Sequence, residues 1–202
     1  FSLVDVVLEC SGHNSSRQFL ERGLTAGAKF VLVSGPSSRA DATFVCGVNE
    51  QEFGKQKIVS NSSCTTNAFA PLLKFLNYNF GIISGNMLTV HCYTGSQPTI
   101  DKPGRDPARS RAAGLSMVPT TTSAALEVTS LLPEIADKVL VSALRVPVPS
   151  VSAIDFSFRT DKPFSSAALV KLLNEHPTLN PIIGCTDKPL VSSDLKGRPE
   201  SI

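Results

Sequence analysis

The sequence predicts a chain that begins in a parallel α/β sheet and continues into an α+β region whose sheet is largely antiparallel. In the first third of the chain, nearly continuous apolar runs alternate with a helical pattern. This alternation is typical of strands buried in a doubly wound parallel sheet. Further along, strands follow one another while the helices are grouped apart, as in an α+β fold. We therefore expect residues 1–63 to belong to one domain and residues 64–202 to another.

The first unit reads as strand, helix, strand. Residues 4–10 are almost all apolar and end at Ser11-Gly12, so we expect a strand buried on both faces. Residues 30–34 form a second apolar run, which ends at Gly35-Pro36. The helix between them has several possible capping residues, an apolar face and a glycine at its end. These are Asn14, Ser15 and Ser16, then Phe19, Leu20 and Leu24, then Gly27.

The remaining elements follow from the same patterns. Short strands are expected at residues 43–46 and 57–59, and a looser strand at residues 87–93. Residues 95–118 are rich in turn residues and basic, which predicts a long functional loop. Strands are expected at residues 139–146 and 151–158, and a helix at residues 165–174 capped by Ser165 or Ser166.

Composition excludes several classes of function. The 202 residues include 19 basic and 17 acidic side chains, and the net charge of +2 offers no electrostatic basis for binding nucleic acid or an anionic membrane. No apolar run is long enough to span a bilayer. Five cysteines at wide spacings, without a Cys-x-x-Cys pair, argue against a disulfide framework or a zinc site and for a reducing compartment. The chain lacks an initiator methionine, and we expect it to be part of a longer protein.

Cys64 is the leading candidate for a catalytic nucleophile. It lies where the strand at residues 57–59 gives way to a helix whose apolar face would carry Phe69, Leu72, Leu73, Leu76 and Phe80. The preceding residues, Ser60-Asn61-Ser62-Ser63, are of the types that cap a helix. Free N–H groups and the helix dipole at that point favour the thiolate. The alternative is a buried cysteine that acts as a small hydrophobic residue.

A base and an anion site complete the predicted chemistry. His91 ends an apolar strand and is placed to pair with Cys64 as a base and acid. Arg145 interrupts a strand and requires an anionic partner, either a phosphate or the carboxylate of Asp155 on the next strand. Arg109 adds charge, and hydroxyls come from Ser63, Thr65, Thr94 and residues 120–123. Together these groups suit acyl transfer on a phosphorylated substrate.

Ser11-Gly12 and Ser34-Gly35 follow two strands of the parallel sheet. Ligands of such sheets bind beyond the carboxyl ends of the strands, so these residues are candidates for contacting a nucleotide. Ordinary turn chemistry is an equal alternative. The phosphate-binding pattern G-x-G-x-x-G does not occur in the sequence.

Five segments of the chain carry a resemblance to a known family. SNSSCTTN, HCYTGSQ, RAAGLSMVPTTTSAA, ALRVPVPSVS and PLVSSD resemble phosphorylating glyceraldehyde-3-phosphate dehydrogenases, in the same order and at similar spacings. The resemblance implies that residues 1–63 are the C-terminal part of an NAD-binding domain. Residues 64–202 would then be the catalytic domain, truncated at its C-terminal end. The family's Gly-rich dinucleotide loop and closing C-terminal helix are not in this sequence.

The resemblance also implies roles for residues. Cys64 would attack the aldehyde of glyceraldehyde 3-phosphate, and His91 would act as the base while hydride leaves for NAD, with NADP not distinguished. Thr94, Arg109 and Arg145 match positions that bind the substrate phosphate. Ser63, Thr65, Thr122 and Ser123 match positions near the inorganic phosphate that releases the product, although Ser123 stands where the family usually has glycine. Ser11, Gly12 and Ser34 match cofactor contacts. A cytoplasmic homotetramer acting in glycolysis is implied, without a metal.

Three other readings remain. Erythrose-4-phosphate dehydrogenase shares the Cys–His pair but departs from the Tyr-Thr that follows the histidine, and this chain has Tyr93-Thr94. A non-catalytic binding domain would not need the set formed by Cys64, His91 and Arg145. A thiol redox sensor built on Cys64 would need only the low thiol pKa.

Overall fold

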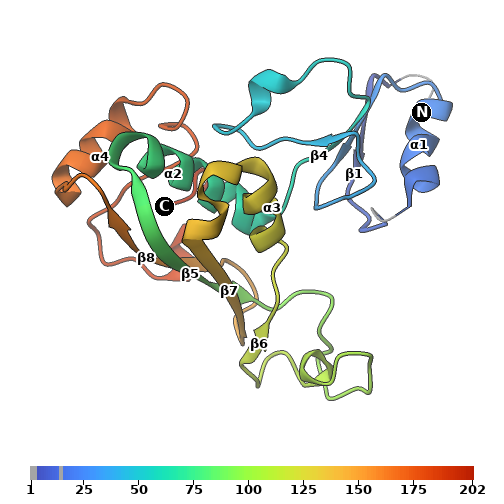
Figure 1. The fold of residues 1–202 in the computed structure, drawn as a ribbon. Helices are drawn as coiled ribbons and strands as arrows, with labels where there is room; N and C mark the ends of the chain where they lie inside the picture. The colour runs from blue at the N-terminus through green and yellow to red at the C-terminus, as the bar shows by residue number, and fades with distance from the viewer. Residues whose placement is uncertain (1–3, 14–15) are drawn as a thin grey trace.

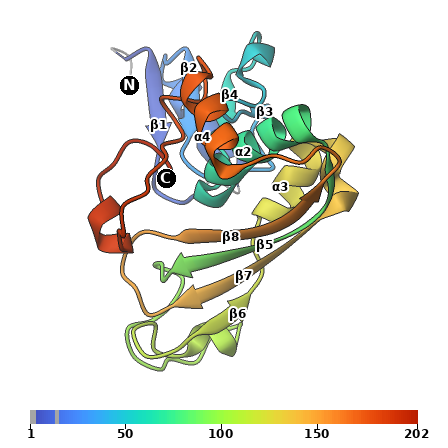
Figure 2. The same ribbon diagram turned by 90° about the vertical axis from the view of Figure 1, so that its left-hand side faces the viewer.

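Two β-sheets are joined by one long helix (Figure 1). The computed structural model describes residues 4–13 and 16–202. The first sheet is wholly parallel and has the order β1 (Val6–Glu9), β2 (Phe30–Val33), β4 (Ile58–Ser60), β3 (Ala42–Thr43). The second has the order β6 (Val118–Thr120), β7 (Val139–Val146), β5 (Ile82–Cys92), β8 (Ala153–Thr160), as Figure 2 shows.

The pairing within the second sheet is mixed. β5 runs parallel to β7, whereas β5 with β8 and β6 with β7 are antiparallel. The predicted fold class, a parallel sheet followed by a largely antiparallel one, is therefore confirmed. The division into domains at residues 63 and 64 stays a prediction.

Helix α1 (Arg17–Thr25) connects β1 to β2 and covers one face of the parallel sheet. Its start is fixed by Ser16, whose hydroxyl accepts a hydrogen bond from the N–H of Phe19 at 3.3 Å. Gly27, at φ +104°, ends it as predicted, because glycine enters the left-handed region without strain. The other two capping candidates, Asn14 and Ser15, lie outside the described residues.

The first strand differs from its prediction. Val6 is 46% exposed and Leu8 is 64% exposed, so β1 is not buried on both faces. Among the described residues β1 forms the edge of its sheet, and α1 packs only against the side that carries Val7 and Val31. An apolar run in the sequence therefore did not reveal which face is covered.

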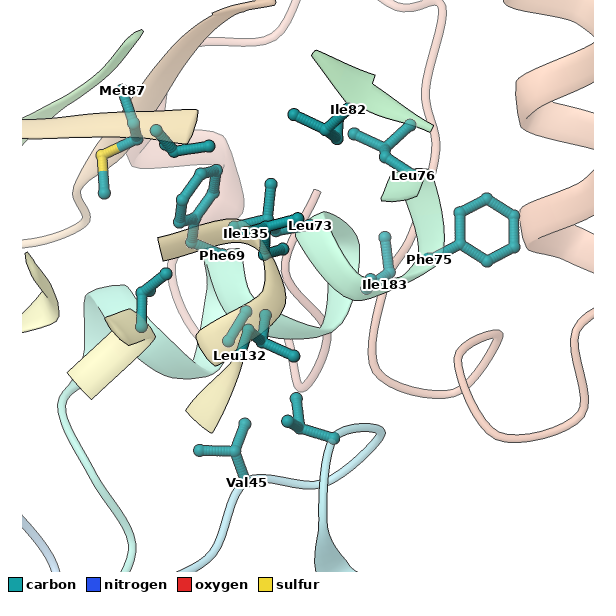
Figure 3. Close-up of a cluster of buried hydrophobic side chains, with 14 of the residues drawn as sticks. Val45, Phe69, Leu73, Phe75, Leu76, Ile82, Met87, Leu132, Ile135 and Ile183 are labelled. Atoms are coloured by element: carbon teal, nitrogen blue, oxygen red, sulfur yellow. The ribbon is translucent and has the colours of Figure 1, made fainter. Parts of the chain in front are cut away.

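The main core lies between the second sheet and the helices α2 (Cys64–Phe80), α3 (Ala124–Leu131) and α4 (Ser166–Glu175). The predicted face of α2 points into it. Figure 3 shows Phe69 near Met87, Leu73 near Ile135 and Leu76 near Ile82, and these side chains are at most 1% exposed. Such burial stabilises the fold by roughly 1.5–3 kcal/mol per side chain and holds α2 rigidly over the sheet.

Several element boundaries differ from the sequence prediction. β3 stops at Thr43, because the side chain of Asn49 accepts from Val45 N and donates to Thr43 O, which turns the chain. β5 begins at Ile82, five residues earlier than expected, where it meets the end of β8. β8 begins at Ala153, after Val151 at φ +67°.

Helix α3 and strand β6 were not predicted. The long loop over residues 95–118 leads into β6 and extends away from the body of the molecule (Figure 1). Short 3-10 helices complete the chain at Glu50–Glu52, Ala108–Ser110, Pro133–Lys138 and Ser192–Leu195. None of the helices in the described part of the chain combines the length and hydropathy that crossing a bilayer requires.

Candidate active site

The N-terminus of α2 is held by hydrogen bonds from two directions. Ser63 caps the helix by accepting from Thr66 N at 3.1 Å. Glu127 on α3 accepts from Thr66 Oγ1 at 2.5 Å and from Ser63 N at 3.3 Å. Ser62 precedes the cap in the left-handed region at φ +62°. These contacts fix the backbone from which the first helical residue, Cys64, projects.

Cys64 and His91 meet at this point. The Sγ atom of Cys64 lies 3.3 Å from Nε2 of His91, although the two residues come from α2 and from the end of β5. The hydrogen bond to His91 lowers the pKa of the Cys64 thiol, and the imidazolium charge and the contacts with Thr65 add to that effect against desolvation. The same hydrogen bond raises the pKa of His91, which burial partly opposes. The pair therefore favours a thiolate beside an imidazolium.

Arg145 lies beside the imidazole. β7 pairs with β5 so that Arg145 is opposite His91, and Nη1 of Arg145 lies 2.7 Å from Nδ1 of His91 and 2.7 Å from the carbonyl oxygen of Cys92. Asp155 of β8 is not its partner, because it pairs with Leu88 of β5. Leu88 lies three residues before His91, so Asp155 projects from the sheet face opposite to that of His91 and Arg145. Arg145 forms no ion pair within the described residues. Burial and the nearby Arg109 lower its pKa.

A cavity of about 540 Å³ opens in front of these groups. Among the described residues its walls are mostly hydroxyls, with two guanidinium groups and no carboxylate. Of the predicted site residues it is lined by Ser34, Ser63, Cys64, Thr65, His91, Thr94, Arg109, Thr122, Ser123 and Arg145. A cavity of this kind has the donors that bind a phosphate.

The hydroxyl wall is organised by Arg109. Its Nε donates to Thr120 Oγ1 at 2.8 Å, Nη2 donates to the same oxygen, and Asp106 lies 3.4 Å from Nε. Thr94 pairs with Ser96 at 3.0 Å, and Thr122 accepts from Ala124 N at 3.2 Å. The long loop thus brings its arginine to the strand β6, so that residues distant in sequence share one wall.

Two predicted cofactor contacts lie outside this cavity. Ser11 and Gly12 follow β1 and do not line it. Ser11 donates from N and from Oγ to the carboxylate of Glu9 and lies 3.0 Å from Nδ1 of His13, which is ordinary turn chemistry. Ser34 and Gly35, which follow the neighbouring strand β2, do line the cavity with Cys64.

Three residues of the site were missed by sequence reasoning. Glu127 was overlooked because α3 was not predicted; its signal was an acidic residue in the first turn of an apolar segment with helical spacing. Thr89 and Ser62 line the cavity, and each has a buried hydroxyl oxygen without a hydrogen-bond partner among the described residues. Thr89 lies two residues before His91 on β5, so the strand alternation places both on one face.

Comparison with known proteins identifies the family. Residues 63–202 match the family model of the glyceraldehyde 3-phosphate dehydrogenase C-terminal domain. The chain belongs to the glyceraldehyde 3-phosphate dehydrogenase family. It is 45% identical over 203 residues to glyceraldehyde-3-phosphate dehydrogenase of Xanthobacter flavus, which covers 98% of this chain and 60% of that protein.

Other members of the family are similar to the same extent. The enzyme of Priestia megaterium is 41% identical over 202 residues, covering 98% of this chain and 60% of the relative. That of Geobacillus stearothermophilus is 40% identical over 198 residues, covering 96% and 59% respectively. The chain therefore spans about 60% of the length of the glyceraldehyde-3-phosphate dehydrogenases that it matches.

Proposed function

We propose that the protein carrying this chain oxidises glyceraldehyde 3-phosphate with NAD and inorganic phosphate, forming 1,3-bisphosphoglycerate through a thioester on Cys64. Such a reaction belongs to glycolysis. The observation that carries the proposal is the 3.3 Å contact between Cys64 and His91 at a helix N-terminus, in a cavity with two arginines. Family membership supports it, and the relatives that the chain matches are glyceraldehyde-3-phosphate dehydrogenases.

The first covalent step uses the ion pair. The Cys64 thiolate adds to the aldehyde carbon, and the resulting oxyanion takes the proton from Nε2 of His91 to give a hemithioacetal. The now neutral His91 then removes the hydroxyl proton as a hydride leaves the carbon, so that the thioester carbonyl forms. Inorganic phosphate attacks the thioester, giving the acyl phosphate and returning Cys64 to its thiolate.

Anions are bound by the hydroxyl and guanidinium walls. We assign Thr94, Arg109 and Arg145 to the phosphate of the aldehyde, and Ser63, Thr65, Thr122 and Ser123 to the attacking phosphate. Arg145 has no carboxylate partner among the described residues, so a phosphate would supply the missing countercharge. Charge-assisted hydrogen bonds of this kind are stronger than neutral ones.

The residues beside Cys64 fit one end of a dinucleotide. Ser34 and Gly35 line the cavity at the carboxyl end of β2. Ser62 lines it too, and its buried hydroxyl has no partner in the described part of the chain, so a ligand amide could supply one. NAD, when bound, accepts the hydride that leaves the hemithioacetal carbon. Ser34 is proposed to contact it, as are Ser11 and Gly12, which lie further away along the strand ends. NADP would use the same contacts.

We also propose that the protein assembles as a homotetramer. Leu140 is 74% exposed on the sheet face opposite α2, and Leu115 and Met117 of the long loop are 86% and 70% exposed. In such an assembly neighbouring chains would cover these apolar side chains. Sedimentation of the full-length protein should give the mass of four chains, and a monomer would contradict the proposal.

The proposed reaction is tested by trapping the thioester. The full-length protein is mixed with NAD and glyceraldehyde 3-phosphate without inorganic phosphate, and the mass of the peptide that contains Cys64 is measured by mass spectrometry. We expect one 3-phosphoglyceroyl group on Cys64, and we expect added inorganic phosphate to release it. Acylation elsewhere would contradict the mechanism. Faster turnover of erythrose 4-phosphate than of glyceraldehyde 3-phosphate would contradict the substrate assignment.

A further inference from the structure

Thr89 lies on the floor of the cavity that holds Cys64. Its side chain is 1% exposed, and its hydroxyl oxygen has no hydrogen-bond partner among the described residues. A buried hydroxyl without a partner lowers stability, because it has given up its hydrogen bonds to water and gained none in return. A hydroxyl of this kind that lines a cavity is a candidate for contacting a ligand.

The register of the second sheet places Thr89 in a row of three cavity residues. Ala143 of β7 pairs with Thr89 of β5 on one side and with Thr120 of β6 on the other. All three residues line the cavity. Neighbouring strands are about 4.8 Å apart, so the Cα atoms of the two threonines are separated by roughly 10 Å. The small side chain of Ala143 between them leaves room for a ligand above the sheet.

Thr89 also lies opposite the first turn of α2. On the same face of β5, Met87 is near Phe69 of α2 (Figure 3), whereas His91 contacts Cys64 at the start of that helix. The strand and the helix therefore run in opposite directions here, and Thr89, halfway between Met87 and His91, lies beneath the helix start. Unpaired N–H groups and the helix dipole at that point favour an anion.

The two ends of the row face different walls of the cavity. Thr120 accepts a hydrogen bond from Arg109, which we assigned to the phosphate of the aldehyde. Thr89 is at the other end, beneath the helix start where Ser63 and Thr65 were assigned to the attacking phosphate. Its position therefore favours the attacking phosphate over the phosphate of the aldehyde.

We propose that the hydroxyl of Thr89 binds the inorganic phosphate that attacks the thioester on Cys64. Rotation about the Cα–Cβ bond turns the hydroxyl toward a ligand without movement of the strand. The hydroxyl donates to one phosphate oxygen and keeps its proton, while another phosphate oxygen bonds to the acyl carbon and the Cys64 thiolate leaves. This inference rests on the proposed function, to which it adds a residue that acts only after the thioester has formed.

The first test measures whether the hydroxyl has a partner in the ligand-free protein. Thr89→Val in the full-length protein removes the hydroxyl and keeps the shape of the side chain. We expect its Tm without phosphate to equal or exceed that of the unmodified protein. Thr66→Val is the matched contrast, because Thr66 is equally buried but donates to Glu127, and its Tm should fall. Equal falls in Tm for the two variants would overturn the proposal.

The second test measures the phosphate dependence of the acylated protein. Cys64 is acylated with NAD and glyceraldehyde 3-phosphate, and release of the acyl group is followed as inorganic phosphate is added. Thr89→Val should raise the phosphate concentration for half-maximal release by about 10- to 100-fold, as expected for the loss of a hydrogen bond to an anion. The rate of acylation should change by less than about threefold. An unchanged phosphate dependence would overturn the inference and leave the proposed reaction intact.

Two further variants separate the hydroxyl from other effects of substitution. Thr89→Ser keeps the hydroxyl and should retain the phosphate dependence of the unmodified protein. Ser142→Ala removes a hydroxyl from the opposite face of the sheet, where it donates to the carbonyl oxygen of Met87 at 3.2 Å, and it should also leave that dependence unchanged. The inference fails if Thr89→Ser behaves like Thr89→Val, or if Ser142→Ala has the same effect as Thr89→Val.

Equilibrium binding separates this inference from the proposed function. Inorganic phosphate is titrated into the ligand-free full-length protein at constant ionic strength, and the heat of binding is measured. Thr89→Val should weaken the Kd by about 10-fold or more whether or not the protein oxidises aldehydes. Such weakening in a protein that does not acylate Cys64 would contradict the proposed function alone. An equal Kd, or no binding at millimolar phosphate, would overturn the inference.

Discussion

Two cysteines flank one imidazole, and their surroundings differ. Cys64 lies 3.3 Å from Nε2 of His91, is exposed, and lines the cavity at the start of α2. Cys92 lies 3.7 Å from Nδ1 of the same ring, is half-buried at the end of β5, and accepts from the hydroxyl of Ser152 at 3.7 Å. Proximity to histidine is therefore common to both thiols and does not distinguish them.

The difference lies in what else each sulfur contacts. Cys64 projects from a helix N-terminus, where unpaired N–H groups and the dipole favour a negative charge. The open cavity in front of it admits a substrate. Cys92 is at the end of a strand and outside the lining of that cavity. The imidazole nitrogen nearest to it, Nδ1 of His91, is also in contact with Arg145. We conclude that the helix start and the cavity, rather than the imidazole alone, select Cys64.

The largest effect should follow from removing the selected thiol. Cys64→Ser in the full-length protein should lower kcat by about 10⁴-fold or more, because an alcohol in this position is a far weaker nucleophile. Phosphate-dependent NADH formation measures the change. Retained turnover would show that Cys64 is not the nucleophile and that its surroundings do not select it over Cys92.

Replacing the shared ring should also have a large effect. The lowered pKa of Cys64 and the raised pKa of His91 both favour the ion pair of thiolate and imidazolium. It is lost by protonation of the thiolate as pH falls through the lowered pKa of Cys64, and by deprotonation of the imidazolium as pH rises through the raised pKa of His91. His91→Asn should move alkylation of Cys64 by iodoacetamide toward the ordinary thiol pKa and slow it at neutral pH by about 10²-fold. An unchanged pH profile would mean that the two side chains do not act as a pair.

Removing the guanidinium of Arg145 should weaken binding of the phosphorylated substrate. Arg145→Leu should raise KM for glyceraldehyde 3-phosphate by about 10- to 100-fold, as expected for the loss of a charged hydrogen bond. KM for unphosphorylated glyceraldehyde should change far less. Equal effects on the two aldehydes would indicate a structural arginine.

Removing the carboxylate that holds the start of α2 should lower the stability of the fold. Glu127→Ala leaves Ser63 N and Thr66 Oγ1 without their acceptor, and it should lower the free energy of unfolding by about 1–3 kcal/mol. Glu134→Ala removes an exposed carboxylate on the next short helix and serves as the control. Thermal unfolding of both variants measures the difference. Equal Tm values would show that α3 does not support the start of α2.

The smallest effect should come from the second thiol. Cys92→Ala removes a sulfur that lies outside the cavity lining, so we expect kcat and the alkylation profile of Cys64 to change by less than about threefold, within the range of a mild packing change. A loss comparable with that of Cys64→Ser would mean that Cys92 takes part in the chemistry.

Much of this site could be predicted from local pattern. The serines before Cys64 and the apolar spacing after it indicated a helix start, and the structure has α2 begin at Cys64 with Ser63 as its cap. The basic loop and Arg145 stood out as charges without evident partners. These signals are short-range, because caps, periodicity and misplaced charges are properties of a few consecutive residues.

Other features depended on contacts between distant segments. Glu127 accepts a hydrogen bond from Ser63 N, which lies 64 positions away in the chain. The residues near either partner do not predict this contact. The exposure of β1 and the separation of Asp155 from Arg145 likewise follow from strand order and register. Ser11 and Ser34 end neighbouring strands with similar residues, yet only Ser34 lines the cavity.

The sequence by itself determined the fold class, the thiol at a helix start and the residue types of an anion site, because backbone propensities and side-chain chemistry act locally. The tertiary structure decided which nitrogen of His91 faces which cysteine, which face of the sheet carries Arg145, and which carboxylate holds the start of α2. Those outcomes follow from the parallel register of β5 with β7 and from the packing of α2 and α3 on one face of the sheet. Register and packing are set by the whole core at once, so no single stretch of residues encodes them.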